Sequence, residues 1–190
     1  MNDKMILTDV DGVLLHWNQG FDTFMRNKGF TKKVNGEYEL GITYGISEEE
    51  AHKYAIEYNQ SAYIGSLPPL RDAIKYVKKL HEEHGYVFHC ISAVPDNQEV
   101  WNLRYENLKK LFGTAIVRLD CSGSSDNKRK YLEEYKDSGL PWIEDKIEMA
   151  ELGLELGLAC YLMEHDYNKK MNNNDIMRIK NWSEVYYSLT

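Results

Sequence analysis

Short apolar runs alternate with helical patterns along most of the chain. The apolar runs have the length of buried strands and lie at Met5–Thr8, Val87–Ser92, Ala115–Leu119, Trp142–Ile143 and Leu158–Met163. The stretches between them carry apolar residues at helical spacing and end at a glycine: Pro68–His84, Asn97–Phe112, Lys128–Ser138 and Lys146–Leu156. Strand and helix in alternation imply crossover connections, so the pattern predicts an α/β fold with a doubly wound parallel sheet.

One segment interrupts this alternation. Residues 14–67 contain no convincing apolar strand, but they contain helical patterns at Phe21–Asn27 and Glu48–Ser61. Ser47, with Glu50 three residues later, has the spacing of a capping box at the start of the second helix. We therefore predict a small helical cap, residues 14–67, inserted after the first strand of an α/β core formed by residues 1–13 and 68–190. The polar piece Asn35–Gly45 is expected to be the loop of this cap.

Composition places the chain among ordinary globular proteins. It has 190 residues, of which 43% are hydrophobic and 28% charged, and its net charge of −7 lacks the basic footprint of a general nucleic-acid or anionic-membrane binder. No apolar stretch approaches the roughly 20 residues of a membrane span, and the opening MNDKMILTDVDG is acidic where a secretory signal is basic. Three widely spaced cysteines are typical of reduced thiols. We expect a cytoplasmic protein without a membrane partner.

The first candidate chemistry lies directly after the first apolar run. Asp9 and Asp11 are one residue apart and are followed by Gly12. If the strand conformation continues, both carboxylates point the same way. They then share a site at the carboxyl edge of the sheet, where ligands of parallel sheets bind. Crowded carboxylates repel each other, and hard oxygen ligands favour Mg²⁺. A solvated turn is the alternative for a lone Asp-Gly, but it is weaker for paired acids at a strand end.

Polar residues also follow three later strands. Ser92 ends the second run, Lys128 follows the third after a Gly/Ser-rich loop, and Glu144 and Asp145 follow the fourth. Each is weak evidence by itself, because such residues often cap helices or face solvent. A doubly wound fold brings all these strand ends to one edge. Together they supply what a phosphoryl group, a metal ion and an attacking carboxylate need.

The order of these residues resembles that of a known family. DVDGV, starting at Asp9, is similar to the first motif of the haloacid dehalogenase-like superfamily, whose members are mostly Mg²⁺-dependent phosphohydrolases. Ser92 in CISA, Lys128 in DNKRKYL and the pair Glu144-Asp145 fit its second, third and fourth motifs. The chain length, the cap position and the segment Asn181–Glu184 resemble the 5'(3')-deoxyribonucleotidase-like group. That group commonly has two aspartates where this chain has Glu144-Asp145.

The resemblance implies a role for each of these residues. Asp9 would be the nucleophile that forms an aspartyl-phosphate, and Asp11 would protonate the leaving oxygen and then activate water. Mg²⁺ would be held by Asp9, by the backbone carbonyl of Asp11 and by Asp145 with help from Glu144. Which of the two fourth-motif acids binds the metal directly stays open at this point.

The phosphate group would be held by a second set of residues. Ser92 and Lys128 would bind its oxygens, with Lys130 as the alternative lysine, and Gly12 would let the backbone approach it. In the cap, Phe21 and Tyr44 are candidates to stack on a substrate base, although aromatic residues more often pack a core. The expected partner is a small phosphorylated substrate.

Several functions remain open from the sequence. A nucleoside monophosphate is the first choice of substrate, followed by a sugar phosphate or the phosphate at a nucleic-acid end. A phosphoacceptor signalling module also combines acids, a hydroxyl and a lysine, but its phosphorylated aspartate follows a later strand and it has no need of a cap. An inactive scaffold would be expected to lack Asp9, Asp11, Lys128 or Asp145, and all four are present.

Overall fold

The computed structural model describes residues 4–170 and 173–190, and over these residues it forms one parallel sheet. The six strands have the order β3-β2-β1-β4-β5-β6, and every neighbouring pair is parallel. Their bounds are β1 Met5–Thr8, β2 Val87–Ser92, β3 Ile116–Cys121, β4 Pro141–Glu144, β5 Ala159–Met163 and β6 Met177–Ile179. The predicted fold class, a doubly wound parallel α/β sheet, is confirmed.

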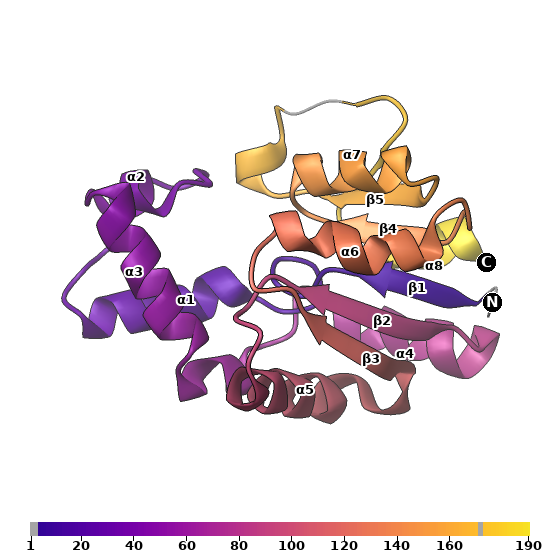
Figure 1. Ribbon diagram of the computed structural model, residues 1–190, viewed down its shortest axis with the longest axis horizontal. Helices are drawn as coiled ribbons and strands as arrows, with labels where there is room; N and C mark the ends of the chain where they lie inside the picture. Colours follow the sequence, from indigo (N-terminus) through magenta and orange to yellow (C-terminus); the bar gives the residue numbers. More distant parts are fainter. Residues whose placement is uncertain (1–3, 171–172) are drawn as a thin grey trace.

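Helices cover both faces of the sheet (Figure 1). One face packs against α4 (Ala73–His84), α5 (Gln98–Phe112) and α8 (Trp182–Leu189), and the other against α6 (Arg129–Leu132) and α7 (Ile147–Glu155). Neighbouring strand residues serve opposite faces, so Ile6 belongs to the first hydrophobic cluster and Leu7 to the second. This alternation buries each strand on both sides and accounts for the continuous apolar runs in the sequence.

Residues 14–67 form the helical segment at the carboxyl ends of the strands. It contains α1 (Trp17–Asn27), α2 (Leu40–Tyr44), α3 (Glu48–Asn59) and the 3₁₀ helix η1 (Ala62–Ser66). In Figure 1 the arrowheads of β1 and β2 point toward this segment. Ser47 caps α3, and its side chain accepts a hydrogen bond from the backbone N–H of Glu50, as the spacing predicted.

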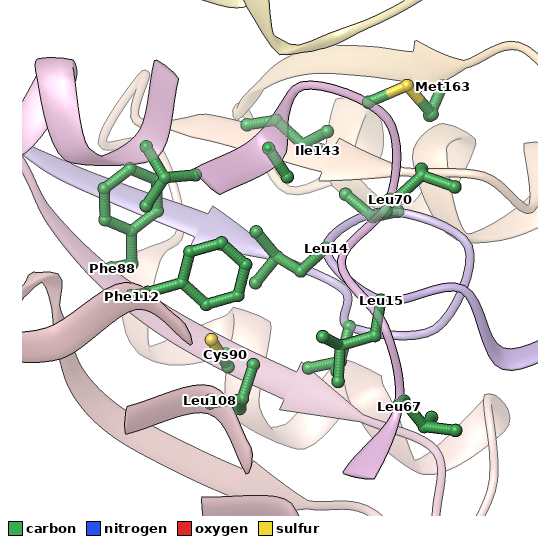
Figure 2. Close-up of a cluster of buried hydrophobic side chains, with 14 of the residues drawn as sticks. Leu14, Leu15, Leu67, Leu70, Phe88, Cys90, Leu108, Phe112, Ile143 and Met163 are labelled. Atoms are coloured by element: carbon green, nitrogen blue, oxygen red, sulfur yellow. The ribbon is translucent and has the colours of Figure 1, made fainter. Parts of the chain in front are cut away.

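The two chain crossings between the sheet and the helical segment lie side by side. The backbone N–H of His16 donates to the carbonyl of Pro68 at 2.8 Å, and that of Leu70 donates to the carbonyl of Leu14 at 2.8 Å. Leu14, Leu15, Leu67 and Leu70, which lie on the two crossings, are buried members of the first hydrophobic cluster (Figure 2). The segment is therefore attached through a short antiparallel ribbon with an apolar underside.

Four features differ from the sequence-based expectations. The predicted loop Asn35–Gly45 contains α2, which ends at Gly45 in the left-handed conformation. The predicted helix Lys128–Ser138 is shorter, because only α6 is α-helical and the 3₁₀ turns η3 (Asp126–Lys128) and η4 (Glu133–Tyr135) flank it. Helix α4 begins at Ala73 and not at Pro68, because the preceding residues pair with Leu14 and Leu15. The edge strand β6 was not predicted, since three residues give too little alternation to detect.

The remaining elements are short. The 3₁₀ turns η2 (Gly113–Ala115) and η5 (Asp166–Asn168) follow α5 and β5, respectively. Cys90, Cys121 and Cys160 are buried free thiols. Within the described part of the chain, no helix has the length and apolar character needed to cross a membrane.

Candidate active site

The carboxyl edge of the sheet and the helical segment enclose a cavity of about 930 Å³. Its lining includes most of the residues that the sequence singled out, namely Asp9, Asp11, Gly12, Phe21, Tyr44, Lys128, Glu144 and Asp145. Ser92 is fully buried behind this lining, with its hydroxyl 3.5 Å from Oδ2 of Asp11. The strand ends thus bring the candidate residues together from widely separated parts of the chain.

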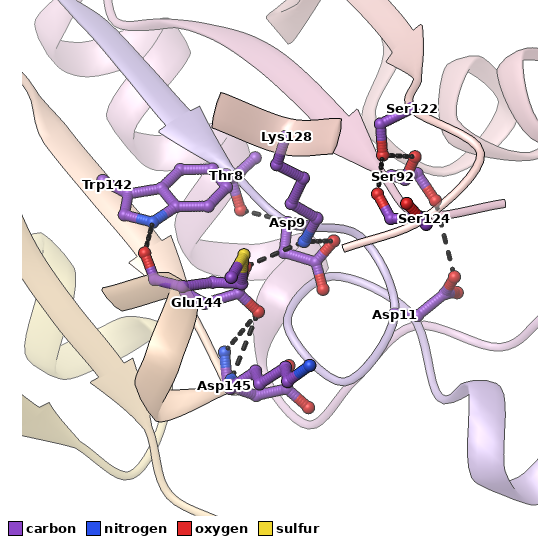
Figure 3. A network of polar contacts seen from close by, with 12 residues as sticks. Thr8, Asp9, Asp11, Ser92, Ser122, Ser124, Lys128, Trp142, Glu144 and Asp145 are labelled. Atoms are coloured by element: carbon purple, nitrogen blue, oxygen red, sulfur yellow. Dashed lines mark hydrogen bonds and ion pairs between the residues drawn. The ribbon is translucent and has the colours of Figure 1, made fainter. Parts of the chain in front are cut away.

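Asp9 stands one residue beyond β1 and is fixed by the sheet. Its backbone N–H donates to the carbonyl of Ile143 at 2.9 Å, which extends the pairing of β1 with β4. Its carboxylate oxygen Oδ1 lies 2.7 Å from Nζ of Lys128 (Figure 3). Lys128 itself is only 2% exposed. Burial raises the pKa of Asp9 to about 7 in the absence of a metal ion, although Lys128 opposes the rise.

Lys128 joins Asp9 to Glu144. Its ammonium lies 2.8 Å from Oε2 of Glu144, while Oε1 of Glu144 accepts the backbone N–H groups of Asp145 and Lys146 at 3.0 and 3.2 Å. Burial would lower the pKa of Lys128, but the two carboxylates outweigh it and raise this pKa. Lys130 is exposed and lies over the ring of Tyr131. The structure therefore places Lys128, and not Lys130, among the acids.

Three acids form a compact oxygen cluster. Asp9, Glu144 and Asp145 each offer a carboxylate oxygen, and these oxygens lie within 4.8 Å of one another. Burial raises the pKa of Glu144 to about 7 and that of Asp145 to about 6. One ammonium faces three carboxyl groups, so ionising all three leaves negative charge that a hard divalent cation such as Mg²⁺ would balance. Glu144 is occupied by Lys128 and two amides, which leaves Asp145 as the better-placed cation ligand of the pair.

Asp11 lies in the same cavity but has different partners. The strand conformation ends at Thr8, and residues 10–15 form a turn in which Leu14 and Leu15 donate backbone hydrogen bonds to Val10. Asp11 consequently turns its carboxylate toward Ser92 (Figure 3). Asp9 and Asp11 share a cavity, as expected, but their carboxylates do not contact the same side chain.

A buried arginine that the sequence reasoning missed holds Asp11. Nη1 of Arg104 lies 2.9 Å from Oδ1 of Asp11, and Nη2 lies 3.0 Å from Oδ2. Only the contact of Nη2 with Oδ2 is aligned as a hydrogen bond; within the described residues, Nη1 and Nε of Arg104 and Oδ1 of Asp11 lack a hydrogen-bond partner, so charge and one hydrogen bond hold the pair together. Arg104 is 0% exposed on α5, on the same stripe as Val100 and Leu108. An arginine at an apolar position of a helix was the signal that could have revealed it.

The aromatic residues proposed for substrate contact are mostly packed. Phe21 is 1% exposed and stacks on Trp17 with ring centroids 4.6 Å apart. Tyr44 is 3% exposed, and its hydroxyl donates to the carboxylate of Asp22. Both contribute to the cavity lining, so their contact with a substrate stays a prediction. Tyr38 also lines the cavity and is 52% exposed, which makes it the most accessible aromatic residue of this group.

Comparison with known sequences identifies a phage relative but no family. No protein-family model matches the chain. An uncharacterised 32.4 kDa protein of Enterobacteria phage T4, from the Gp30-rIII intergenic region, is 28% identical over 139 residues, which are 70% of this chain and 49% of the phage protein. The chain therefore spans about half the length of this curated relative.

Solved structures resemble the chain over nearly its whole length. A haloacid dehalogenase-like family hydrolase from Streptococcus pneumoniae has a TM-score of 0.67 at 14% identity and covers 100% of both chains. The HAD-hydrolase YfnB from Bacillus subtilis, bound to magnesium, has a TM-score of 0.63 at 12% identity and covers 98% of both. A D,D-heptose 1,7-bisphosphate phosphatase from Burkholderia thailandensis has a TM-score of 0.58 at 10% identity, covering 98% of this chain and 97% of its own. The fold is that of the haloacid dehalogenase-like hydrolases.

Proposed function

We propose that this protein is a Mg²⁺-dependent phosphomonoesterase that works through an aspartyl-phosphate on Asp9. The observation that carries the proposal is the position of Asp9. It lies at the end of the central strand β1, faces the cavity, contacts Lys128 and stands among three mutually close acids. This arrangement offers a nucleophile, a cation for phosphoryl oxygens and a hard-metal ligand set in one place.

Asp9 acts as the nucleophile in the proposed first step. One of its carboxylate oxygens forms a bond to phosphorus, and the bond between phosphorus and the ester oxygen breaks. Lys128 lies 2.7 Å from Asp9 and is positioned to neutralise charge on the oxygens of the phosphoryl group. The ester oxygen leaves with a proton from Asp11, whose pKa burial raises while Arg104 opposes the rise.

Asp11 acts as the base in the second step. It accepts a proton from a water molecule whose oxygen attacks the phosphorus of the aspartyl-phosphate. The bond between phosphorus and Asp9 then breaks, which returns the carboxylate of Asp9 and releases inorganic phosphate. Each proton that Asp11 gives to the leaving group is thus recovered from water, and the enzyme is unchanged after one turnover.

The acids also account for the metal in this proposal. Asp9, Asp145 and the backbone carbonyl of Asp11 would hold Mg²⁺, and Glu144 would keep Lys128 in place. The cation would stabilise the negative charge on the transferring phosphoryl group. Three carboxylates within 4.8 Å of one another fit such an ion by charge and by donor type.

A nucleoside monophosphate is the substrate we propose first. The cavity of about 930 Å³ is wide enough for a ligand of that size, and Tyr38 exposes an aromatic ring to it. Any base can stack on an aromatic side chain, because every base has a flat π-face, and stacking needs only an accessible ring. The proposal of a 5'(3')-deoxyribonucleotidase-like enzyme rests on this feature together with the chain length, the cap position and the segment Asn181–Glu184.

A phosphatase screen tests the proposal. Phosphate release would be measured with and without Mg²⁺ on nucleoside monophosphates, sugar phosphates and oligonucleotides with a terminal phosphate. Asp9→Asn should reduce release to background while the circular dichroism spectrum is unchanged, because an amide is not a nucleophile. Asp175→Asn, which alters an exposed acid, is the matched control. Activity of Asp9→Asn near the wild-type rate, or activity that survives exhaustive chelation, would contradict the proposal.

A further inference from the structure

The segment after β5 folds back over the candidate metal cluster. Three of its side chains reach the two loops that carry the acids. The hydroxyl of Tyr167 donates a hydrogen bond to Oδ2 of Asp145, Nε2 of His165 lies 2.7 Å from the carbonyl oxygen of Gly12, and Asn168 donates to the backbone carbonyl of Asp145 at 2.8 Å. The polar residues predicted for the site follow the first four strands, whereas this segment follows the fifth strand, β5.

His165 and Tyr167 form a unit. Their rings are stacked with centroids 4.9 Å apart and an interplanar angle of 6°. A carbonyl oxygen only accepts hydrogen bonds, so Nε2 of His165 must be protonated and donate the hydrogen bond to the carbonyl of Gly12. The backbone carbonyl of His165 accepts the backbone N–H of Asn168 at 3.1 Å. The hydrogen bond to Gly12 and the stack on Tyr167 thus hold the ring of His165 in place.

Asn168 fixes the base of the segment. It is 1% exposed, donates to the carbonyl of Met163 at 2.8 Å and accepts the backbone N–H of His165 at 3.0 Å. Arg178 of β6 donates to its side-chain and backbone oxygens at 3.2 and 3.1 Å. These hydrogen bonds of Asn168 hold the segment rigidly on the end of β5. Such rigidity is required of a residue that positions another.

The packing around Gly12 shows how closely these groups meet. Gly12 has φ of +80°, and a Cβ atom there would stand 3.2 Å from the hydroxyl of Tyr167 and closer still to the carboxylate of Asp145. The turn after β1, the carboxylate and the hydroxyl are therefore in direct contact. A displacement of Tyr167 would therefore disturb both the turn at Gly12 and the loop that carries Asp145.

We propose that Tyr167 is a positioning residue that orients Asp145 for the cation, with His165 supporting it and holding the turn at Gly12. The hydroxyl of Tyr167 binds Oδ2 of Asp145 and leaves the other oxygen of this carboxylate for the metal ion. Hydrogen bonds from the outer shell fix the orientation of metal ligands, and their loss typically weakens metal affinity by about 10–100-fold. This inference rests on the proposed function, because it presumes that the acids bind a divalent cation.

Metal binding itself tests the inference. The dissociation constant for Mn²⁺ would be measured by electron paramagnetic resonance, and that for Mg²⁺ by competition, on the whole wild-type chain and on Tyr167→Phe. We expect affinity about 10–100-fold weaker in Tyr167→Phe. Tyr187→Phe is the control, because it also removes a tyrosine hydroxyl but lies 71% exposed on α8, away from the cavity lining. Its affinity should equal that of the wild type.

A second pair of variants separates positioning from packing. His165→Leu removes the hydrogen bond to Gly12 and should weaken Mn²⁺ binding. His165→Gln retains an N–H group at a similar reach and should restore at least part of the affinity. A merely structural role would make the two variants alike in affinity and would lower the melting temperature in both.

The outcomes are distinguishable from failure of the proposed function. Wild-type protein that binds neither Mn²⁺ nor Mg²⁺ overturns the proposed metal site and this inference together. Wild-type protein that binds metal, with Tyr167→Phe equally tight, overturns the inference alone. Tighter binding by Tyr167→Phe would also overturn it, because the hydroxyl would then compete with the cation for Asp145.

Discussion

The pair formed by Arg104 and Asp11 provides the sharpest stability test. Arg104→Met keeps much of the apolar stem but leaves the carboxylate of Asp11 without its guanidinium. Removing one partner of a fully buried ion pair costs about 3–5 kcal/mol, because the remaining charge is uncompensated; the side chain of Asp11 is 22% exposed, so this range is the upper bound here. For a chain of this length, 1 kcal/mol corresponds to about 2–4 °C, so the melting temperature should fall by up to about 20 °C. The value would be measured by urea unfolding and thermal denaturation at pH 7 without metal.

An exposed arginine–carboxylate pair with similar distances gives the control. Arg129 binds both oxygens of Glu155 at 3.1 and 2.8 Å, but the two side chains are half-exposed. Arg129→Met should therefore cost no more than about 1 kcal/mol. The exposed pair has one hydrogen bond more than the buried pair, so a larger loss at Arg104 would be due to burial and not to the number of hydrogen bonds.

A double variant completes the cycle. Arg104→Met combined with Asp11→Asn leaves no lone charge, so it should be more stable than Arg104→Met alone. The reasoning would be refuted if Arg104→Met cost less than about 1 kcal/mol, or if the double variant were no more stable than the single one. Either result would mean that the contact between Arg104 and Asp11 contributes little to the free energy of unfolding.

Three further predictions concern the acids and the cavity. Burial raises the pKa of Asp9 and Glu144 to about 7 and that of Asp145 to about 6, above the unfolded values of 3.8 and 4.5. The folded state therefore binds more protons than the unfolded state between about pH 4 and 7, and its stability should fall as pH rises through this window. Thermal melts without metal should show a lower melting temperature at pH 8 than at pH 5 and a smaller difference with Mg²⁺; an identical pH dependence with and without metal would contradict this. Gly12→Ala places a Cβ against Asp145 at a φ of +80°, so phosphatase assays should show loss of activity, and wild-type turnover would contradict the crowding. Tyr38→Ala should raise KM for a nucleoside monophosphate by about 5–150-fold, corresponding to about 1–3 kcal/mol of stacking, and much less for a small aryl phosphate; equal changes in steady-state kinetics would exclude stacking.

The strand ends were the part of the site that the sequence could reveal. Parallel topology dictates that residues after consecutive strands meet at one edge, which is why Asp9, Lys128 and Asp145 could be grouped without coordinates. Which side chain each acid contacts could not be predicted from the sequence. Alternation suggested that Asp9 and Asp11 point the same way, but β1 ends at Thr8 and the following turn gives Asp11 a different partner.

Arg104 and Tyr167 show why the rest was hidden. Arg104 lies in the middle of a helix rich in charged residues, and only its register with Val100 and Leu108 distinguishes it from a surface arginine. Tyr167 belongs to a short 3₁₀ turn, where no periodicity relates a side chain to a face. Its contact with Asp145 depends on tertiary packing across 22 positions of the chain. Such contacts leave no local pattern.

The ribbon formed by the two chain crossings ties the helical segment to the sheet as one connection. His16 bonds to Pro68 and Leu70 bonds to Leu14, each at 2.8 Å, so the two crossings are held to each other and are not independent linkers. Asn107 of α5 adds a second attachment, because its side chain donates to the carbonyl of Leu67 at 3.1 Å. The cavity between the segment and the strand ends is therefore bounded by a wall that is fixed to the core at two places.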